Sequence, residues 1–443
     1  MKTPIWDFVR TYSANSPLRA HMPGHKGISR LGFEQWDITE LDGADSLYCA
    51  EGIIAESEKN ASSLFEAHTF YSTEGSSQCI RAMLYLAKLY ASENNLPCCI
   101  AAGRNAHQVF ITAAALLGID VAWLYSKANC SYLSCPLQPE ELDTFLQENP
   151  VAAVYVTSPD YLGNTLDIAA LAEVAHRHHC LLLVDNAHGA YLKFLDISRH
   201  PMDLGADICC DSAHKTLSAL TGAAYLHISR AAPQSLLMQA KKALALFGST
   251  SPSYLILQSL DCLNLVLSTD YRNILQNFVL KVDNLKDKLV QNGYVLQGSE
   301  SLKITLSTKP YGYTGDDFAQ ILIQNHLYTE FHDPDFVVLM LTPDHRDEDL
   351  RAIENVLLSV PRKPAIWETP PAFSVPKQIL SAQEALYAPA ETLCIENSLG
   401  RVVAFSGVSC PPAVPIVVSG EQIDEKSLSA FRYYSIKTVN VVK

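Results

Sequence analysis

The feature that most constrains the fold is an alternation of short apolar runs with amphipathic stretches, which begins near residue 60. The expected strands cover residues 98–103, 121–126, 151–158, 181–187, 206–213 and 222–229, and the expected helices cover 76–93, 107–118, 138–149 and 166–179. Short apolar strands separated by amphipathic helices are typical of a mainly parallel sheet that is covered on both faces. We therefore expect an α/β fold whose ligands bind at the carboxyl ends of the strands.

The remainder of the chain suggests further segments around this sheet. Residues 1–58 are expected to pack on a major domain at 59–252, and a helical segment at 253–293 leads away from it. A smaller α/β domain at 294–368 contains strand-like runs such as "SLKITLST" and "FVVLMLTP". The Pro-rich stretch "VPRKPAIWETPPAFSVP" indicates a linker, and the C-terminal domain at 369–443 is expected to contain short strands joined by turns.

Composition narrows the class of protein. Hydrophobic residues make up 48% of the 443 residues and charged residues 18%, as in a folded globular protein. The net charge of −14 argues against a nucleic-acid partner. The chain start has no apolar core of a signal peptide, and no apolar run is long enough to span a membrane. The twelve cysteines lie inside apolar runs without CxxC spacing, which predicts reduced thiols in a cytoplasmic protein and no metal site.

Two polar groups follow expected strands at points where strand ends should converge. Asp185 ends the run "LLLVD", and Lys215 stands in "DSAHKT" directly after the run "ADICC". Lysine is almost never buried unless it is paired or chemically used. An acid at a buried strand end needs a cation or a strong hydrogen-bond donor. Each residue taken alone has an ordinary structural explanation.

A third group lies before the helix expected at 76–93. Gly75, Ser76 and Ser77 could cradle a phosphate with backbone amides and hydroxyls, although such a turn is commonly only a helix cap. Together with Asp185 and Lys215, this order of groups is what pyridoxal 5'-phosphate chemistry requires. The lysine amine would bind the cofactor aldehyde, and the aspartate would keep the pyridine nitrogen protonated.

The chain resembles the short bacterial branch of the fold-type-I pyridoxal-phosphate-dependent ornithine/lysine/arginine decarboxylases. The resemblance rests on "HMPGHKG", "TELDGADSLY", "EGSSQ", "GRNAHQ", "VDNAHG", "DSAHKT" and "STSPSY", which occur in this order and span almost the whole chain. The tail segments "LTPDH" and "SLGRVVAF" also fit the family. The "HMPGHKG" motif contains two histidines, but its Pro-Gly break argues against a helical metal-binding pair.

The resemblance implies roles for the residues that would surround the cofactor ring. Lys215 would carry the cofactor, Asp185 would pair with the pyridine nitrogen, and His107 would stack on the ring. Ala187 is small and would let the ring lie against its other face. His214 would be the natural proton donor to the substrate's α-carbon.

The resemblance also implies residues for the phosphate and the substrate. The phosphate would be held by Gly75, Ser76, Ser77 and Gln78, with Ser212 and His214 lining the same site. Ser249 or Thr250 would reach the phosphate of a neighbouring subunit. Glu330 would recognise the distal cation of the substrate, with Asp333 as the next candidate.

Two positions depart from the family pattern. Asn186 stands where the family usually has an acid, and Gln78 replaces a small residue in the phosphate loop. Both leave in doubt whether substrate and rate follow the better-studied members. They motivate one alternative, a cofactor-binding protein with little turnover. A second alternative is another fold-type-I reaction, such as aminotransfer, aldol cleavage or elimination, because the lysine–aspartate pair is common to all of these.

The resemblance favours α-decarboxylation of lysine, ornithine or arginine, which yields a polyamine or its precursor. Which of the three is preferred cannot be read from the residues. The family's N-terminal wing domain is expected to be absent, because the chain reaches "HMPGHKG" within its first thirty residues. The expected active unit is then a homodimer with shared active sites.

Overall fold

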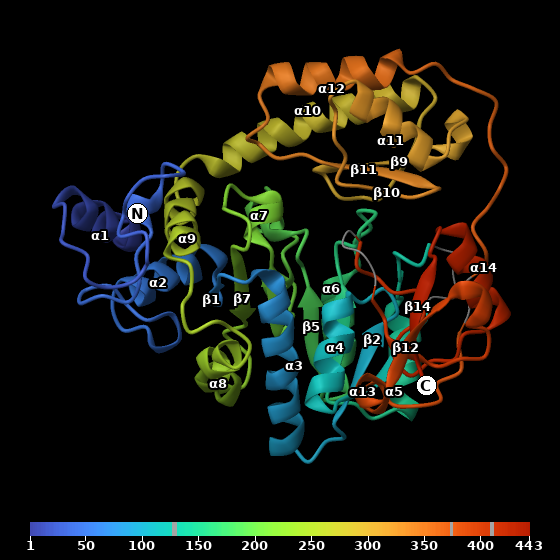
Figure 1. Ribbon diagram of the computed structural model, residues 1–443, viewed down its shortest axis with the longest axis horizontal. Helices are drawn as coiled ribbons and strands as arrows, with labels where there is room; N and C mark the ends of the chain where they lie inside the picture. The colour runs from blue at the N-terminus through green and yellow to red at the C-terminus, as the bar shows by residue number, and fades with distance from the viewer. Residues whose placement is uncertain (126–130, 373–374, 408–411) are drawn as a thin grey trace. The chain divides into compact units, whose positions relative to one another are not determined.

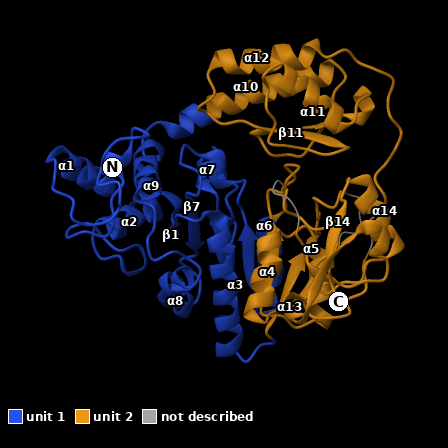
Figure 2. Cartoon of the chain, viewed as in Figure 1, with its two compact units in different colours: residues 1–97, 168–275 blue, residues 98–167, 276–443 orange. Residues whose placement is uncertain are grey.

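The computed structural model describes residues 1–125, 131–372, 375–407 and 412–443 (Figure 1). The chain divides into two compact units, which Figure 2 shows in different colours. Unit 1 comprises residues 1–97 and 168–275, and unit 2 comprises residues 98–167 and 276–443. The five segments expected from the sequence cut the chain at other points and remain a prediction.

Unit 1 contains four neighbouring strands in the order β1-β7-β6-β5. Their bounds are His68–Ser72 for β1, Leu181–Asp185 for β5, Ile208–Asp211 for β6 and Ala224–Ile228 for β7. Strands β5 and β6 are parallel, whereas β7 pairs antiparallel with both β6 and β1. Every residue of β5 and β6 is buried, which explains their continuous apolar character.

The helices of unit 1 pack on these strands or on one another. They are α1 Pro4–Ala14, α2 Ile53–Phe65, α3 Gly75–Glu93, α6 Ile168–Arg177, the short α7 Ala213–Thr216, α8 Gln234–Ala245 and α9 Tyr254–Leu267. Helix α3 packs against β6, β7 and α8, and its buried side chains recur at helical spacing. The amino terminus of α3 therefore lies within the same unit as the carboxyl ends of β5 and β6.

Unit 2 begins with three parallel strands in the order β4-β2-β3. Their bounds are Cys99–Gly103 for β2, Asp120–Leu124 for β3 and Ala153–Thr157 for β4, with helices α4 Gln108–Leu117 and α5 Pro139–Glu148 between them. Helix α4 ends at Gly118, whose φ of +60° is the left-handed conformation that favours glycine. The parallel pairs in both units confirm the expected mainly parallel α/β fold class.

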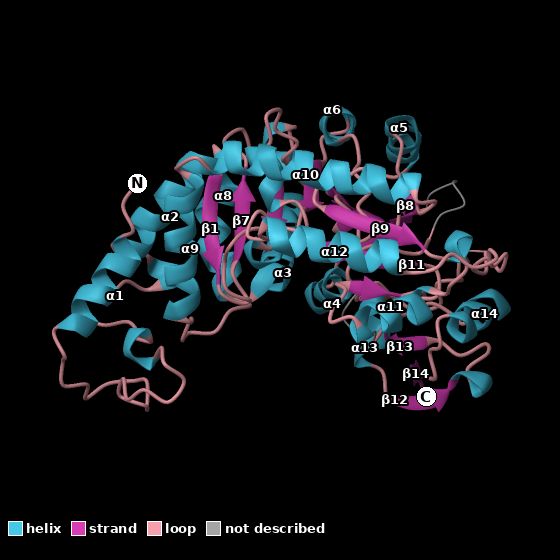
Figure 3. Cartoon of the chain, turned by 90° about the horizontal axis from the view of Figure 1, so that it is seen from above, coloured by secondary structure: helices cyan, strands magenta, loops and turns pink. Residues whose placement is uncertain are grey.

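A four-stranded antiparallel sheet follows in unit 2, in the order β10-β11-β9-β8. Its strands are β8 Val295–Gln297, β9 Lys303–Ser307, β10 Phe331–His332 and β11 Phe336–Met340, and its helices are α10 Tyr271–Gln291, α11 Gly315–Gln324 and α12 Asp347–Ser359. Figures 1 and 3 show α10 and α12 running across this sheet. The expected helical segment at 253–293 is thus two helices, α9 and α10, which are separated at residues 268–270.

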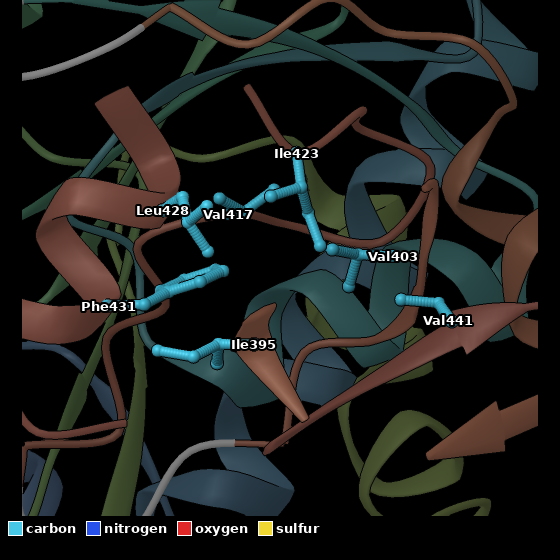
Figure 4. Packing of buried hydrophobic residues seen from close by; sticks show 7 residues of the cluster. All are labelled: Ile395, Val403, Val417, Ile423, Leu428, Phe431 and Val441. Carbon is cyan, nitrogen blue, oxygen red and sulfur yellow. The ribbon is translucent and has the colours of Figure 1, made fainter. Parts of the chain in front are cut away.

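The C-terminal part of unit 2 is built on a three-stranded sheet in the order β12-β14-β13. Its elements are α13 Ala382–Tyr387, β12 Ala390–Cys394, β13 Val403–Phe405, α14 Glu425–Tyr433 and β14 Thr438–Val442. Figure 4 shows its apolar cluster, which joins strands, loops and α14: Ile395, Val403, Val417, Ile423, Leu428, Phe431 and Val441. The expected linker forms no helix or strand at 360–372. Parts of the expected strand at 121–126, of the linker and of the tail motif lie outside the described residues.

Candidate functional site

The candidate site begins at the carboxyl ends of β5 and β6. The two strands are parallel, and Asp185 at the end of β5 lies opposite Cys210 of β6. Parallel neighbours finish at the same edge of a sheet, so the segments that follow each strand emerge together. Lys215 follows β6 on the short helix α7, and residues 186–189 follow β5.

The lysine meets a histidine at this edge. Lys215 Nζ lies 2.8 Å from His188 Nε2, within hydrogen-bonding distance. Lys215 is half-buried and His188 is buried. An ammonium group has only donors, so His188 accepts this bond through Nε2 when the lysine is charged. His188 was not among the predicted site residues, although it stands three residues after Asp185 in the sequence.

Asp185 is buried, and the residue is 3% exposed. Its Oδ1 accepts a hydrogen bond from the backbone N–H of Ala187 at 3.2 Å and lies 3.6 Å from the thiol sulfur of Cys210. These contacts orient the carboxyl group at the strand end. Cys209 and Cys210 are buried free thiols, as the sequence analysis predicted for the cysteines in apolar runs.

The amino terminus of α3 supplies the loop that was predicted to hold phosphate. Gly75 has a φ of +69°, which favours glycine, and a Cβ added there would meet no atom within 4 Å. Ser212 Oγ donates to Ser76 Oγ at 2.9 Å, so the start of α7 lies beside the start of α3. Open space, serine hydroxyls and a helix amino terminus are features that suit an anionic group. Ser77 lies in the same first turn and is half-buried.

Gln78 has a different environment from the one we expected. Its side chain is fully buried, and its Oε1 accepts a hydrogen bond from Ser72 Oγ at 2.5 Å. Its Nε2 donates to Tyr48 Oη and to the Leu244 carbonyl, each at 2.8 Å. Both ends of the amide bind protein groups, and a contact of Gln78 with phosphate remains a prediction. Gln78 connects α3 to the segment at Tyr48 and to α8.

His214 is oriented by the backbone. Its Nδ1 lies 2.9 Å from the carbonyl oxygen of Ala223, which can only accept, so Nδ1 carries a proton and donates to it. The imidazole of the residue before Lys215 is therefore held in one tautomer when it is neutral. This orientation is compatible with the predicted proton-donor role, which remains a prediction.

A buried hydrogen-bond network around Asp211 explains why position 186 is an amide. Asn186 Nδ2 donates to Asp211 Oδ1 at 2.6 Å, while His200 Nε2 and His227 Nε2 lie 2.9 and 3.1 Å from Asp211 Oδ2. Burial opposes the charge of Asp211, but the two histidines hold its pKa below the usual range. An acid at position 186 would place a second carboxylate against Asp211. The Asn186 amide instead donates a hydrogen bond to Asp211, which is a structural reason for the departure from the family pattern at position 186.

The same network contains a group with metal-ligating atoms, comprising His200, Cys209, Asp211 and His227. His200 Nδ1 accepts a hydrogen bond from the backbone N–H of Met202 at 3.3 Å. Its ring proton therefore lies on Nε2, where it is donated to Asp211 and leaves no lone pair for a metal ion. We interpret the group as a hydrogen-bonded network.

In "HMPGHKG", the two histidines contact different residues, His21 with Tyr12 and His25 with Asp37.

The contacts or exposure of four predicted site residues do not test their assigned roles. His107 is the N-cap of α4 in unit 2, where its Nδ1 accepts from Val109 N at 3.1 Å. Glu330, also in unit 2, accepts a hydrogen bond from Tyr161 Oη at 2.9 Å, a partner that the sequence analysis did not identify. Thr250 is exposed in unit 1, next to Ser249, whose backbone N–H donates to Glu74 of the same chain.

Asp333 stands in the turn between β10 and β11. Its Oδ1 accepts hydrogen bonds from the backbone N–H groups of Asp335 and Phe336, both at 2.8 Å. Burial raises the pKa of this carboxyl group to about 7. The side chain therefore stabilises the turn, which gives it a structural role that the sequence analysis did not expect.

The fold and this edge of the sheet define an α/β protein with a lysine and an aspartate at the ends of adjacent parallel strands. A family model described as "Orn/Lys/Arg decarboxylase, major domain" matches residues 3–343. The chain belongs to this family, which confirms the resemblance found in the sequence.

Individual relatives agree with this membership. The arginine decarboxylase of Bacillus subtilis is 26% identical to the chain, over 97% of this chain and 92% of the relative. The fold is similar to that of lysine decarboxylase A from Pseudomonas aeruginosa, with a TM-score of 0.81, 17% identity and coverage of 99% and 80% of the two chains. The Francisella novicida lysine decarboxylase has a TM-score of 0.79 at 15% identity, with coverage of 100% and 81%. Within the described part of the chain, no helix has the length and apolar character needed to cross a membrane.

Proposed function

We propose that this protein is a pyridoxal-phosphate-dependent decarboxylase of a basic amino acid. The observation that carries the proposal is the 2.8 Å contact of Lys215 Nζ with His188 Nε2, at the edge where Asp185 ends the adjacent parallel strand. The family membership and the arginine decarboxylase relatives support the same reaction. Arginine is the first substrate to test, with lysine and ornithine beside it.

The residues at this edge fit the cofactor. Lys215 offers a primary amine for the aldehyde, Asp185 offers a buried carboxylate for the pyridine nitrogen, and the open first turn of α3 offers Ser76 and Ser77 for the phosphate. When bound, the pyridine ring accepts the electron pair that is released as carbon dioxide leaves the substrate. Gln78 is not part of this proposal, because its amide is occupied by protein partners.

The protein's own groups would control protons around Lys215 Nζ. His188 Nε2 accepts from the ammonium and holds the side chain in one direction, and it can take up a proton when the amine must be neutral to react. His214, fixed through Nδ1–H to the Ala223 carbonyl, is the proposed donor to the substrate's α-carbon. His107 is proposed to stack on the ring and Ala187 to lie against its opposite face.

Glu330 is the proposed recognition group for the distal cation of the substrate. Its carboxylate accepts from Tyr161 Oη, which orients it while leaving its negative charge uncompensated by that neutral partner. An ammonium or guanidinium group is a suitable partner for such a carboxylate. We no longer propose Asp333 for this purpose, because its carboxyl group stabilises a turn.

We further propose a homodimer with shared sites and a cytoplasmic location, and a role in forming polyamines or their precursors. The turn containing Ser249 and Thr250 lies beside Glu74, immediately before the proposed phosphate loop of its own chain. In the dimer its hydroxyls would reach the partner's phosphate. A mixing experiment tests the shared site. Chains with Lys215→Ala are refolded together with chains in which Ser249 and Thr250 are both replaced by bulky apolar residues. The hybrid dimers should regain part of the activity. Inactive hybrids of proven composition would contradict the shared site.

The function itself is tested by carbon dioxide release. The purified protein, supplied with pyridoxal 5'-phosphate, is offered arginine, lysine, ornithine and a set of neutral, acidic and aromatic amino acids, with Lys215→Ala as the control. Release from a basic amino acid alone is expected. Keto-acid or elimination products without carbon dioxide would identify another reaction, and no turnover would favour a binding protein. The departures at Gln78 and Asn186, which suggested a binding protein, each have protein hydrogen-bond partners.

A further inference from the structure

Unit 2 contains a cavity of about 930 Å³, and all the residues that line it belong to this unit. Its wall includes residues from the four-stranded sheet, from the segment at 366–372 and from α14. Apolar and aromatic side chains such as Phe336, Ile366 and Tyr434 line it together with a few charged groups. A cavity of this size and mixed lining suits an organic molecule with an aliphatic body and polar ends.

A buried carboxylate with an unpartnered oxygen lies in this wall. Asp335 is 7% exposed, and its Oδ1 is bonded to Tyr433 Oη at 2.5 Å and to Lys309 Nζ at 3.0 Å. Its Oδ2 is buried and has no hydrogen-bond partner. Asp333, two residues earlier, is also 7% exposed and has an unpartnered Oδ2. Leaving a buried charged oxygen without a partner is costly, so Asp335 Oδ2 in the cavity wall is a place where a ligand donor would be stabilised.

The buried cluster holds two carboxyl groups and one cation, and burial favours the protonated form of Asp333. Asp333 and Asp335 carry two carboxyl groups, and Lys309 is the cation that reaches Asp335. Lys309 also donates to the Glu368 carbonyl at 3.0 Å, while the Glu368 carboxylate, at the limit of ion-pair distance, is largely exposed. Lys426, on the wall from α14, is exposed. The buried part of the cluster therefore has more carboxyl groups than cations.

Two tyrosine rings line the same cavity as Asp335. Tyr132 and Tyr434 both line the cavity, and their ring centroids are 4.8 Å apart in an edge-to-face arrangement. Burial, and then the charges of Asp333 and Asp335, raise the pKa of both phenols. Aromatic faces beside carboxylates are a combination that attracts organic ammonium groups.

We propose that this cavity binds a linear aliphatic polyamine, with one ammonium group at Asp335 and its methylene chain against the aromatic wall. Calcium or magnesium would fit less well, because such ions need several converging oxygen ligands and the wall is largely apolar and aromatic. The proposal stands independently of the proposed catalytic function. If the protein also releases an amine, the same site would let the product act on the enzyme at a second position.

Isothermal titration calorimetry with spermidine tests the proposal on the full chain. The protein is titrated as purified and again after borohydride treatment, which blocks any cofactor-bound lysine. The same saturable binding is expected in both preparations, and none with an aliphatic diol of the same length. Asp335→Asn should weaken spermidine binding at least tenfold. Ala430→Trp, which places an indole in the cavity from α14, should abolish it.

Asp316→Asn is the matched control, because this exposed acid belongs to the same part of unit 2, pairs with His332 and does not line the cavity. Its affinity should stay within twofold of the wild type. Unfolding curves and far-ultraviolet circular dichroism check each variant, and if Asp335→Asn is misfolded, Ala430→Trp decides the question. No spermidine binding by the wild type, equal affinity in all folded variants, or binding of calcium alone would overturn the proposal.

Discussion

Replacing His188 tests the central feature of the candidate site. The 2.8 Å bond from Lys215 Nζ is partly buried, so His188→Ala leaves an ammonium donor without its partner. A hydrogen bond to a charged group contributes about 1.5–3 kcal/mol. If that bond holds the amine in its reactive direction, the loss corresponds to a roughly ten- to hundredfold lower kcat/KM. The decrease should appear mainly in kcat, because His188 is a positioning residue and is not proposed to bind the substrate's distal group.

Steady-state carbon dioxide release from the preferred basic amino acid measures the effect. His188→Gln should recover part of the activity, since its Oε1 can accept from Lys215 Nζ. The control is His176→Ala on α6, which removes a half-exposed histidine bonded to Asp207 at 2.9 Å. Urea unfolding of all variants separates a local effect from a loss of folding. A His188→Ala enzyme that retains kcat/KM within twofold of the wild type would refute the reasoning.

Three further predictions address other residues. Borohydride should fix pyridoxal 5'-phosphate to Lys215 and not to Lys193, whose ammonium is already paired with two acids; an adduct on Lys193 in peptide mapping would reverse the assignment. Glu330→Gln should raise KM for the basic amino acid by roughly ten- to a hundredfold while cofactor absorbance is unchanged, because it keeps an acceptor for Tyr161 but loses the charge. Burial raises the pKa of Asp333 from 3.8 to about 7, so the folded state favours the protonated carboxyl group. The contribution of this group to the stability of the fold is therefore present below about pH 4 and is lost as the pH rises through 7. Relative to Asp333→Asn, the wild type should therefore lose stability to urea between pH 5 and pH 8, and parallel pH profiles would contradict this.

Much of the fold could be predicted because its signals are local. The apolar runs that became β2, β4, β5, β6 and β7 are short and continuous, and the helices between them repeat their apolar residues at helical spacing. The break between α9 and α10 was not predicted, because both sides of residues 268–270 have helical patterns. Strand order and the antiparallel β7 also depend on pairing between distant segments, which periodicity does not encode.

The sequence by itself indicated that Asp185 and Lys215 would each follow a buried strand, since each stands directly after or at the end of an apolar run. Only the tertiary structure decided what surrounds them. His188 meets Lys215 because the turn after β5 and helix α7 emerge at one edge, and Asn186 is an amide because Asp211 lies against it. Gln78 was assigned to phosphate from its place in a motif, yet packing directs its amide to partners 6, 30 and 166 residues away in the chain. Such contacts depend on which side chains share a buried volume after folding, and buried polar groups then take whatever donors and acceptors lie within reach.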